Sequence, residues 1–372
     1  MGHNDIPSPS NCTPSNGNTL PSLYKRSLLT EYWSKPVSQL NVVDLKTAAL
    51  DLATPVGRER HRIYCNLLMK LIHRFWNGNK RGPLGTYPWR VNQLVEKGIY
   101  RGDLFPNDLL DPLRVRWDRY LGHNIACIAV DGRGEIIDFE FNHNDFFRSS
   151  AEHAEARMVR RLFGLADIRD SWRTGERLPK KSRAFSLKDV TLYTSLESCA
   201  QCSGVMSLGR VKQVIYLQND PGAYMVGNMM FNLAGKETGD GSSLAAIPIP
   251  ASAVELPQYD QLNDAYSAFM DDMEKAEQVN DTDRAFFLPP SFIAGKSSAD
   301  YSASITSFLC TDTALEFFAA GGRALDTMKL DHEDGVYRPD PDTLTNKEVL
   351  EEARGFFEYA DVEGFRGSPH KL

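Results

Sequence analysis

The sequence of 372 residues contains no apolar run of membrane-spanning length. A helix needs roughly 18 to 20 consecutive apolar residues to cross a bilayer, and no stretch of the chain approaches that length. Residues 1–22 are rich in Ser, Pro, Asn and Thr and lack the basic start and apolar core of a signal peptide. We therefore expect a cytoplasmic protein with no membrane partner and a disordered lead-in over residues 1–22.

Cysteine is scarce, and closely spaced cysteines are scarcer. Among the six cysteines only Cys199 and Cys202 lie near each other in the sequence. Disulfide scaffolds belong mostly to short secreted chains, so a chain of this length is not expected to be one. A Cys-x-x-Cys pair in a cytosolic protein indicates a metal site or redox chemistry instead.

Charge is present in ordinary amount but is unevenly distributed. Hydrophobic residues make up 42% and charged residues 24% of the chain, which is typical of a globular protein. Residues 1–188 carry 29 Lys and Arg against 20 Asp and Glu, whereas residues 189–372 carry 13 against 29. The basic half either faces a phosphate-bearing partner or docks against the acidic half and is neutralised by it.

The two ends of the chain have the apolar spacing of helices. Residues 40–53 and 58–76 repeat apolar side chains at helical intervals, so we expect a helical N-terminal region over residues 23–112. The same spacing recurs in a C-terminal region, residues 257–372, over residues 264–276, 313–328 and 346–357.

Between these regions the pattern changes to short apolar strands that alternate with helices. A strand at 125–130, a turn at 131–134 and a strand at 135–141 predict a hairpin. Two strand–helix–strand units follow, with strands at 190–195 and 214–217 and with helices that begin at Ser149 and near Cys199. We predict an α/β fold with three layers, α/β/α, and a mixed sheet over residues 113–256, flanked by the helical N- and C-terminal regions.

Residues of metal-binding type lie at the starts of these two helices. Ser149 with Glu152 three positions later matches a capping box and would place His153 and Glu155 in the first two turns. Cys199 and Cys202 fall on one side of the first turn of the second helix. A helix N-terminus stabilises thiolate over thiol, so both cysteines are expected to be ligands.

One histidine and two thiolates form a donor set for catalytic zinc, which keeps its fourth position for water. We therefore predict one Zn²⁺ per chain, held by His153, Cys199 and Cys202, with Glu155 as the group that transfers protons. Taken alone, the cysteine pair is also compatible with a redox dithiol or half of a structural zinc site.

These residues resemble the signature of the cytidine deaminase-like superfamily, which reads His-x-Glu followed by Pro-Cys-x-x-Cys. Here His153-Ala154-Glu155 is followed by Cys199-Ala200-Gln201-Cys202. The stretch 192–199, Leu-Tyr-Thr-Ser-Leu-Glu-Ser-Cys, is similar to Leu-Tyr-x-Thr-Leu-Glu-Pro-Cys of the tRNA adenosine deaminase and deoxycytidylate deaminase branch. The similarity extends over about residues 113–256.

The resemblance implies hydrolytic removal of an exocyclic amine from a nucleobase-type ring of cytosine, adenine or guanine, in a nucleoside, nucleotide or related small molecule. It also implies substrate contacts at Asn142, Ala154 and Ser198; in that branch an asparagine at the position of Asn142 contacts the sugar. A base in tRNA or single-stranded nucleic acid is the alternative substrate, and a non-catalytic, zinc-stabilised interaction domain is a further alternative. Members of the superfamily often form homo-oligomers, which is one expectation for this chain. The alternative is that its helical flanks replace the contacts between subunits by contacts within one chain.

The sequence departs from the family pattern in two places near the site. Ser198 replaces the family's proline, and its side chain is expected to cap the following helix. The interval between His153 and Cys199 is lengthened by an insertion at 167–186, a basic loop that either holds phosphate or is simply solvated. Glu197 is expected to support the metal ligands or to favour the helix N-terminus.

Overall fold

The computed structural model describes residues 52, 54–76, 123–144, 149–165, 187–223, 225–234, 244–278, 304–336 and 342–363. Three predictions lie wholly or largely outside these residues: the lead-in at 1–22, the basic insertion at 167–186, and the helical N-terminal region at 23–112 with its helix at 40–53, of which only residues 52 and 54–76 are described.

A mixed five-stranded sheet forms the centre of the fold, as the alternation of strands and helices predicted. The strands are β1 (Ala126–Val130), β2 (Ile136–Phe141), β3 (Thr191–Thr194), β4 (Gln213–Tyr216) and β5 (Ile247–Pro250). Their order across the sheet is β2-β1-β3-β4-β5. β1 runs antiparallel to both β2 and β3, whereas β3, β4 and β5 are parallel. The predicted hairpin and the predicted parallel part of the sheet are therefore confirmed.

β5 was not predicted, because its sequence, Ile-Pro-Ile-Pro, contains two prolines. A central strand uses its amide hydrogens to bind a neighbouring strand on each side, and proline has no amide hydrogen. Proline within an apolar run therefore argues against a central strand. β5 lies at the edge of the sheet, beside β4 alone. An edge strand tolerates proline, since one of its sides has no ladder to complete.

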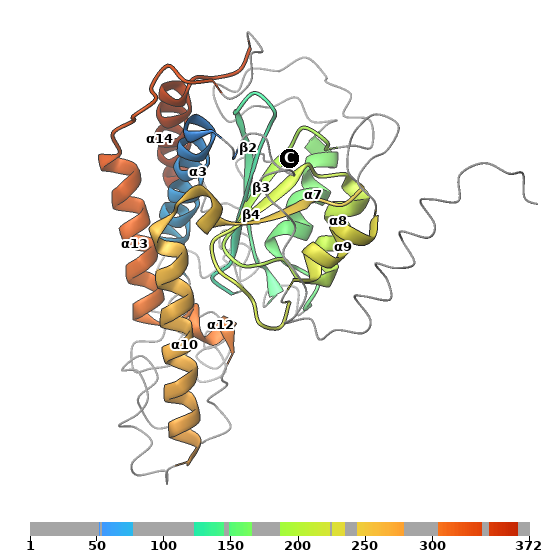
Figure 1. The fold of residues 1–372 in the computed structure, drawn as a ribbon, viewed down its shortest axis with the longest axis vertical. Helices are drawn as coiled ribbons and strands as arrows, with labels where there is room; N and C mark the ends of the chain where they lie inside the picture. The colour runs from blue at the N-terminus through green and yellow to red at the C-terminus, as the bar shows by residue number, and fades with distance from the viewer. Residues whose placement is uncertain are drawn as a thin grey trace, which may run out of the picture.

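Helices cover both faces of the sheet and complete the α/β/α layers (Figure 1). One face carries α7 (Ala154–Leu165), which contacts β1, β2 and β3, with α8 (Ala200–Gly209) and α9 (Val226–Ala234) beside it. The other face is covered by α3 (Pro55–Arg74), which contacts β1 and β3, and by α14 (Asn346–Glu363), which contacts β2. Outside them lie α10 (Pro257–Gln278), α12 (Ile305–Phe308) and α13 (Asp312–Thr327), and a short 3₁₀ helix, η3 (Ala251–Val254), precedes α10.

The helix predicted at 58–76 is α3, and it packs directly on the strand that leads to the site. His61 Nδ1 lies 2.7 Å from the hydroxyl of Tyr193 on β3, and both side chains are buried. The Tyr64 hydroxyl donates a 2.6 Å hydrogen bond to the carbonyl of Gly134 in the hairpin turn. Gly134 has a φ of 100°, a conformation that favours glycine, so the turn and the helix fit only with glycine there.

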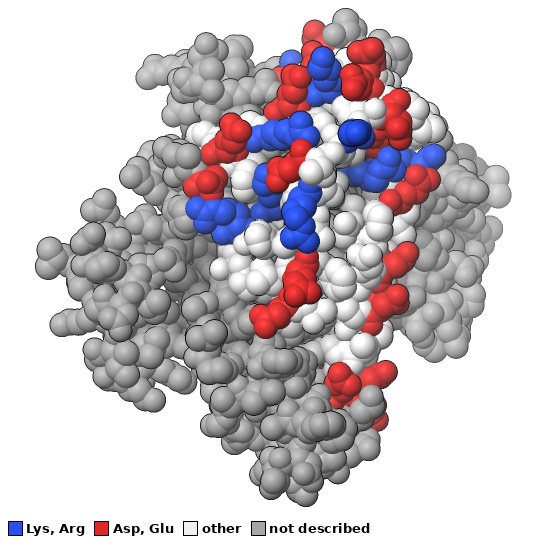
Figure 2. Space-filling model, turned by 90° about the vertical axis from the view of Figure 1, so that its left-hand side faces the viewer, with Lys and Arg blue, Asp and Glu red and all other residues white. Residues whose placement is uncertain are grey.

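Cations of the basic half pair with carboxylates of the acidic half on the outer face of the helical layer. On α3, Arg58 and Arg62 bind Glu255 at 3.1 and 3.2 Å. Further ion pairs join Lys70 to Asp326 and Arg74 to Asp361. Figure 2 shows the helical side of the molecule, where Lys and Arg lie interleaved with Asp and Glu in the upper part and Asp and Glu alone lie in the lower part. These ion pairs neutralise part of the excess positive charge of the basic half with part of the excess negative charge of the acidic half. None of the described helices is both long and apolar enough to cross a bilayer.

Candidate metal centre and active site

The predicted metal-binding residues meet where β3 ends and the helices α7 and α8 begin. Cys199 is the N-cap residue of α8, with extended backbone angles, and Cys202 lies in the first turn, as predicted. The Gln201 side chain donates a 2.8 Å hydrogen bond to the carbonyl of Ala151. The start of α8 is thereby fixed to the segment that carries His153, although the two ligand segments are far apart in the sequence.

The start of α7 differs from the prediction. The helix begins at Ala154, not at Ser149, whose hydroxyl instead accepts a hydrogen bond from the amide of Ala151 in a turn. A capping box needs Glu152 to bind back to the amide of Ser149, but the Glu152 carboxylate pairs with Arg157 on α7. His153 precedes the helix and accepts its first backbone hydrogen bond, from the amide of Arg157.

Asn142 takes the capping role that the sequence assigned to Ser149. Its side-chain Oδ1 accepts a 2.7 Å hydrogen bond from the amide of Ala154, the first residue of α7. Asn142 follows β2 directly and is buried. The end of the hairpin therefore fixes the helix start and, with it, the position of His153.

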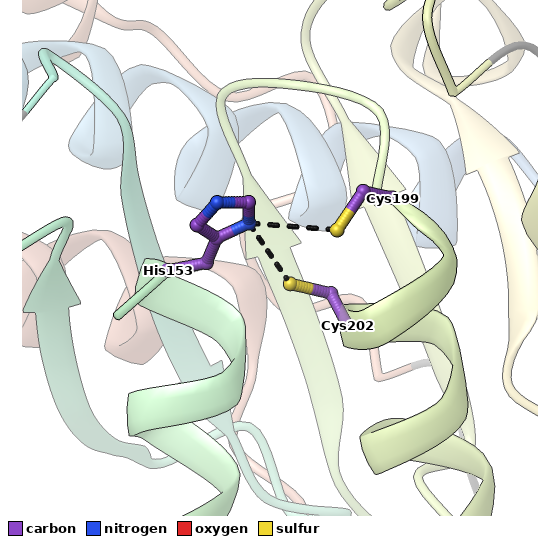
Figure 3. Close-up of side chains that lie close together, drawn as sticks. All are labelled: His153, Cys199 and Cys202. Atoms are coloured by element: carbon purple, nitrogen blue, oxygen red, sulfur yellow. Dashed lines mark hydrogen bonds between the residues drawn. The ribbon is translucent and has the colours of Figure 1, made fainter. Parts of the chain in front are cut away.

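The three predicted ligands converge with their donor atoms facing one another (Figure 3). His153 Nδ1 lies 3.4 Å from Cys199 Sγ and 3.5 Å from Cys202 Sγ, and all three donor atoms lie within 4.8 Å of one another. With Zn–N near 2.05 Å and Zn–S near 2.3 Å, tetrahedral zinc would separate such atoms by about 3.6 Å. The residues present thus fit a zinc ion in both chemistry and spacing.

The electrostatics of the cysteine pair favours the thiolate at Cys199 alone, whereas a thiolate was expected at both cysteines. Hydrogen bonds from the Cys202 thiol and from His153 lower the pKa of Cys199 to about 4, despite its burial. The contact with Cys199 and burial raise the pKa of Cys202 above its usual range. Cys202 is fully buried, whereas Cys199 and His153 are partly exposed. The triad is therefore closed on the protein side and open toward solvent, as a fourth, exchangeable ligand requires.

Glu155 lies beside the triad in a buried position. It is 3% exposed, and its Oε2 lies 3.4 Å from Cys202 Sγ. Its Oε1 accepts hydrogen bonds from the hydroxyls of Thr194, at 2.9 Å, and Ser198, at 3.2 Å. Burial raises the pKa of Glu155 above that of an ordinary glutamate. A carboxylate with a raised pKa is suited to accept and release a proton near neutral pH.

Comparison with known proteins agrees with this geometry. Residues 114–218 match the family described as the cytidine and deoxycytidylate deaminase zinc-binding region. The match supports the resemblance to the cytidine deaminase-like superfamily over this part of the chain. A solved chain from biochemical and structural studies of A-to-I editing by tRNA deaminases at the wobble position is also similar. It shares 22% sequence identity, with coverage of 34% of this chain and 82% of its own, at a TM-score of 0.23.

Ser198, which replaces the family's proline, does not cap α8 as expected. The N-cap residue is Cys199, and no side-chain hydrogen bond caps the helix. The Ser198 hydroxyl turns instead to Glu155, because the loop places it within 3.2 Å of the carboxylate. The serine of this deaminase domain therefore contributes a hydrogen-bond donor that proline cannot supply.

The other two predicted substrate residues, Asn142 and Ala154, bind each other in the structure. The side chain of Ala154 is fully buried, and its amide is the donor to Asn142 Oδ1. Contact of either residue with a substrate stays a prediction that rests on the family resemblance.

Sequence reasoning missed Thr194 and assigned Glu197 to other roles. Thr194 alternates with Tyr193 along β3, and this period of two places its hydroxyl on the face of α7. That alternation was the signal that could have identified it. Glu197 does not touch the ligands: its carboxylate accepts hydrogen bonds from the amides of Asp220 and Met225, in the segment that follows β4.

Proposed function

We propose that this protein is a zinc-dependent hydrolytic deaminase. It removes an exocyclic amine from a cytosine, adenine or guanine ring in a nucleoside, nucleotide or related small molecule. The observation that carries the proposal is the position of Glu155, buried, in contact with Cys202 and held by two hydroxyls. A purely structural zinc site has no use for such a carboxylate, which argues against a non-catalytic interaction domain.

The residues of the site divide the chemistry among them. His153, Cys199 and Cys202 would hold one Zn²⁺, which when bound lowers the pKa of a water molecule and so supplies the nucleophile near neutral pH. The carboxylate of Glu155 would accept a proton from water and would deliver protons to the ring nitrogen and to the leaving amine. The carbon–nitrogen bond to the amine breaks, so that water and the amine-bearing ring give the corresponding carbonyl compound and ammonia.

Ammonia release from the purified, zinc-loaded chain tests the proposal. Cytosine, adenine and guanine compounds are screened as bases, nucleosides and nucleotides, beside short single-stranded RNA and DNA. Glu155→Gln is the matched control, since the amide keeps the shape of the side chain but cannot accept the proton; it should retain zinc and lose at least about a hundredfold in rate. Equal activity of Glu155→Gln and wild type would remove Glu155 from this role.

The screen also separates the two substrate classes. Contacts along a phosphate backbone make binding fall steeply with salt. Turnover of nucleosides that is indifferent to salt supports the small-molecule substrate. Turnover confined to RNA or DNA, with strong salt dependence, would contradict the small-molecule substrate and identify a nucleic acid as the substrate.

A further inference from the structure

The segment that follows β4, described at residues 217–223 and 225, is fixed to the loop that leads to Cys199 and Cys202. The amide of Glu197 donates a 2.8 Å hydrogen bond to the carbonyl of Gln218. The Glu197 carboxylate accepts hydrogen bonds from the amides of Asp220, at 3.2 Å, and Met225, at 2.7 Å. Because Glu197 lies two residues before Cys199, these three bonds hold the segment beside the metal centre.

The same segment is fixed on its other side by α10, which belongs to the C-terminal region. Asn263 Oδ1 accepts a 3.1 Å hydrogen bond from the amide of Asn219. The Tyr259 hydroxyl donates a 2.7 Å hydrogen bond to Asn219 Oδ1. Asn263 is itself oriented by a 2.8 Å bond from its Nδ2 to the carbonyl of Tyr259. A third contact between the segment and α10 joins the Gln218 side chain to the carbonyl of Leu262, at 3.3 Å.

Asp220 is the charged residue that this double attachment places near the ligands. Its Oδ1 accepts a hydrogen bond from the amide of Gly222, and its own amide donates to the carboxylate of Glu197, two residues before Cys199. His153 and Cys199 are the two ligands that are partly exposed. Through Glu197 the segment is therefore attached to the loop that ends at Cys199, one of these two partly exposed ligands.

We propose that α10 forms part of the substrate site: Asn263 and Tyr259 are positioning residues that hold Asn219, and through it Asp220, beside the metal centre. The family match ends at residue 218, so α10 lies outside the part of the chain that the match covers. The kinetic consequence of this proposal rests on the proposed deaminase function, whereas the attachment itself does not.

Hydrogen–deuterium exchange of the zinc-loaded full chain tests the attachment without any substrate. Asn263→Ala removes the acceptor of the Asn219 amide, and we expect exchange of residues 217–225 to rise about tenfold. Tyr259→Phe removes a single hydroxyl and preserves the ring, so it keeps the test valid if Asn263→Ala does not fold; about a fivefold rise is expected. Asp264→Ala, an exposed neighbour on the same helix, is the matched control. Exchange equal to that of the control in both variants would overturn the proposal.

Steady-state kinetics on the compound with the fastest ammonia release test the consequence. Both variants should keep the zinc content of the wild type and raise KM at least about threefold while kcat changes less than about twofold. Raised exchange with unchanged KM would overturn the role of α10 in the substrate site. If the wild type releases ammonia from no compound, the proposed function fails, and exchange alone then decides whether α10 holds the segment.

Discussion

The hydroxyls of Ser198 and Thr194 should shift the acid limit of catalysis, because they bind the carboxylate that must be ionised to accept a proton. In the structure Glu155 Oε1 accepts one hydrogen bond from Thr194, at 2.9 Å, and a longer one from Ser198, at 3.2 Å. Burial raises the pKa of Glu155, and hydrogen bonds to the carboxylate oppose that rise. Removal of a donor therefore raises the pKa further, and the acidic limb of the kcat/KM profile moves to higher pH.

The magnitude follows from the two bond lengths. A hydrogen bond to a charged group contributes about 1.5 to 3 kcal/mol, and each unit of pKa corresponds to about 1.4 kcal/mol. The longer bond from Ser198 belongs at the lower end of this range, so Ser198→Ala should shift the acidic limb upward by about one pH unit. Thr194→Val, which removes the shorter bond at nearly constant volume, should shift it by up to about two units.

The assay is kcat/KM against pH for wild type, both variants and Ser207→Ala. Ser207 lies on the same helix as Cys202, and its hydroxyl donates to the carbonyl of Ser203. It makes no hydrogen bond to Glu155 among the contacts of the described residues, so its profile should match that of the wild type. Zinc content is measured in parallel and should be unchanged in all four proteins. A limb that stays in place in Ser198→Ala and Thr194→Val would show that these hydroxyls do not tune Glu155.

Two further predictions concern the metal and the core. His153→Ala and Cys202→Ala should each lose zinc, measured as metal per chain after gel filtration. Cys310→Ala, which alters a buried cysteine outside the triad, should keep it. Full metal content in either ligand variant would contradict the ligand assignment. Arg161→Met should lower the free energy of unfolding by about 3 kcal/mol, because it leaves the fully buried carboxylate of Asp138 and that of Glu140, 1% exposed, without this cation. Arg160→Met is the control for urea unfolding. The Arg160 side chain is 60% exposed in its pair with Glu152, so its variant should lose less than about 1 kcal/mol of unfolding free energy. Equal losses in the two variants would refute a stabilising role for the buried ion pairs of Arg161.

The close approach of Cys199 and Cys202 could be predicted because its signal is local in the sequence. Cys199 and Cys202 are three residues apart, and a helix that follows a strand places both at its first turn without reference to the rest of the chain. The hairpin was likewise encoded by two apolar runs and the turn between them. Asp131 completes that turn locally, since its Oδ1 accepts hydrogen bonds from the amides of Arg133, Gly134 and Glu135.

The start of α7 could not be predicted in the same way, because its capping partner is not a neighbour. Ser149 and Glu152 have the spacing of a capping box, but arginines on α7 bind the Glu152 carboxylate more strongly than a neutral amide does. The amide of Ala154 then finds its acceptor in Asn142, twelve residues earlier. Which of two acceptors caps a helix depends on charges that approach from other elements, and a local pattern does not contain them.

The same reasoning explains why the C-terminal region had no predicted role in the site. Periodicity identified a helix at 264–276, but α10 begins at Pro257, and the residues that bind the segment after β4 lie in its first turns. Tyr259 and Asn263 each use one polar atom to bind Asn219, which lies 40 and 44 residues earlier in the sequence. Such contacts produce no periodic pattern in the sequence. A residue that positions a loop through a single hydrogen bond is invisible to amphipathic spacing, because spacing reports only which side of a helix is apolar. The residues of the candidate metal centre could therefore be found from local sequence patterns, whereas the contacts of Tyr259 and Asn263 with Asn219 become visible only in the fold.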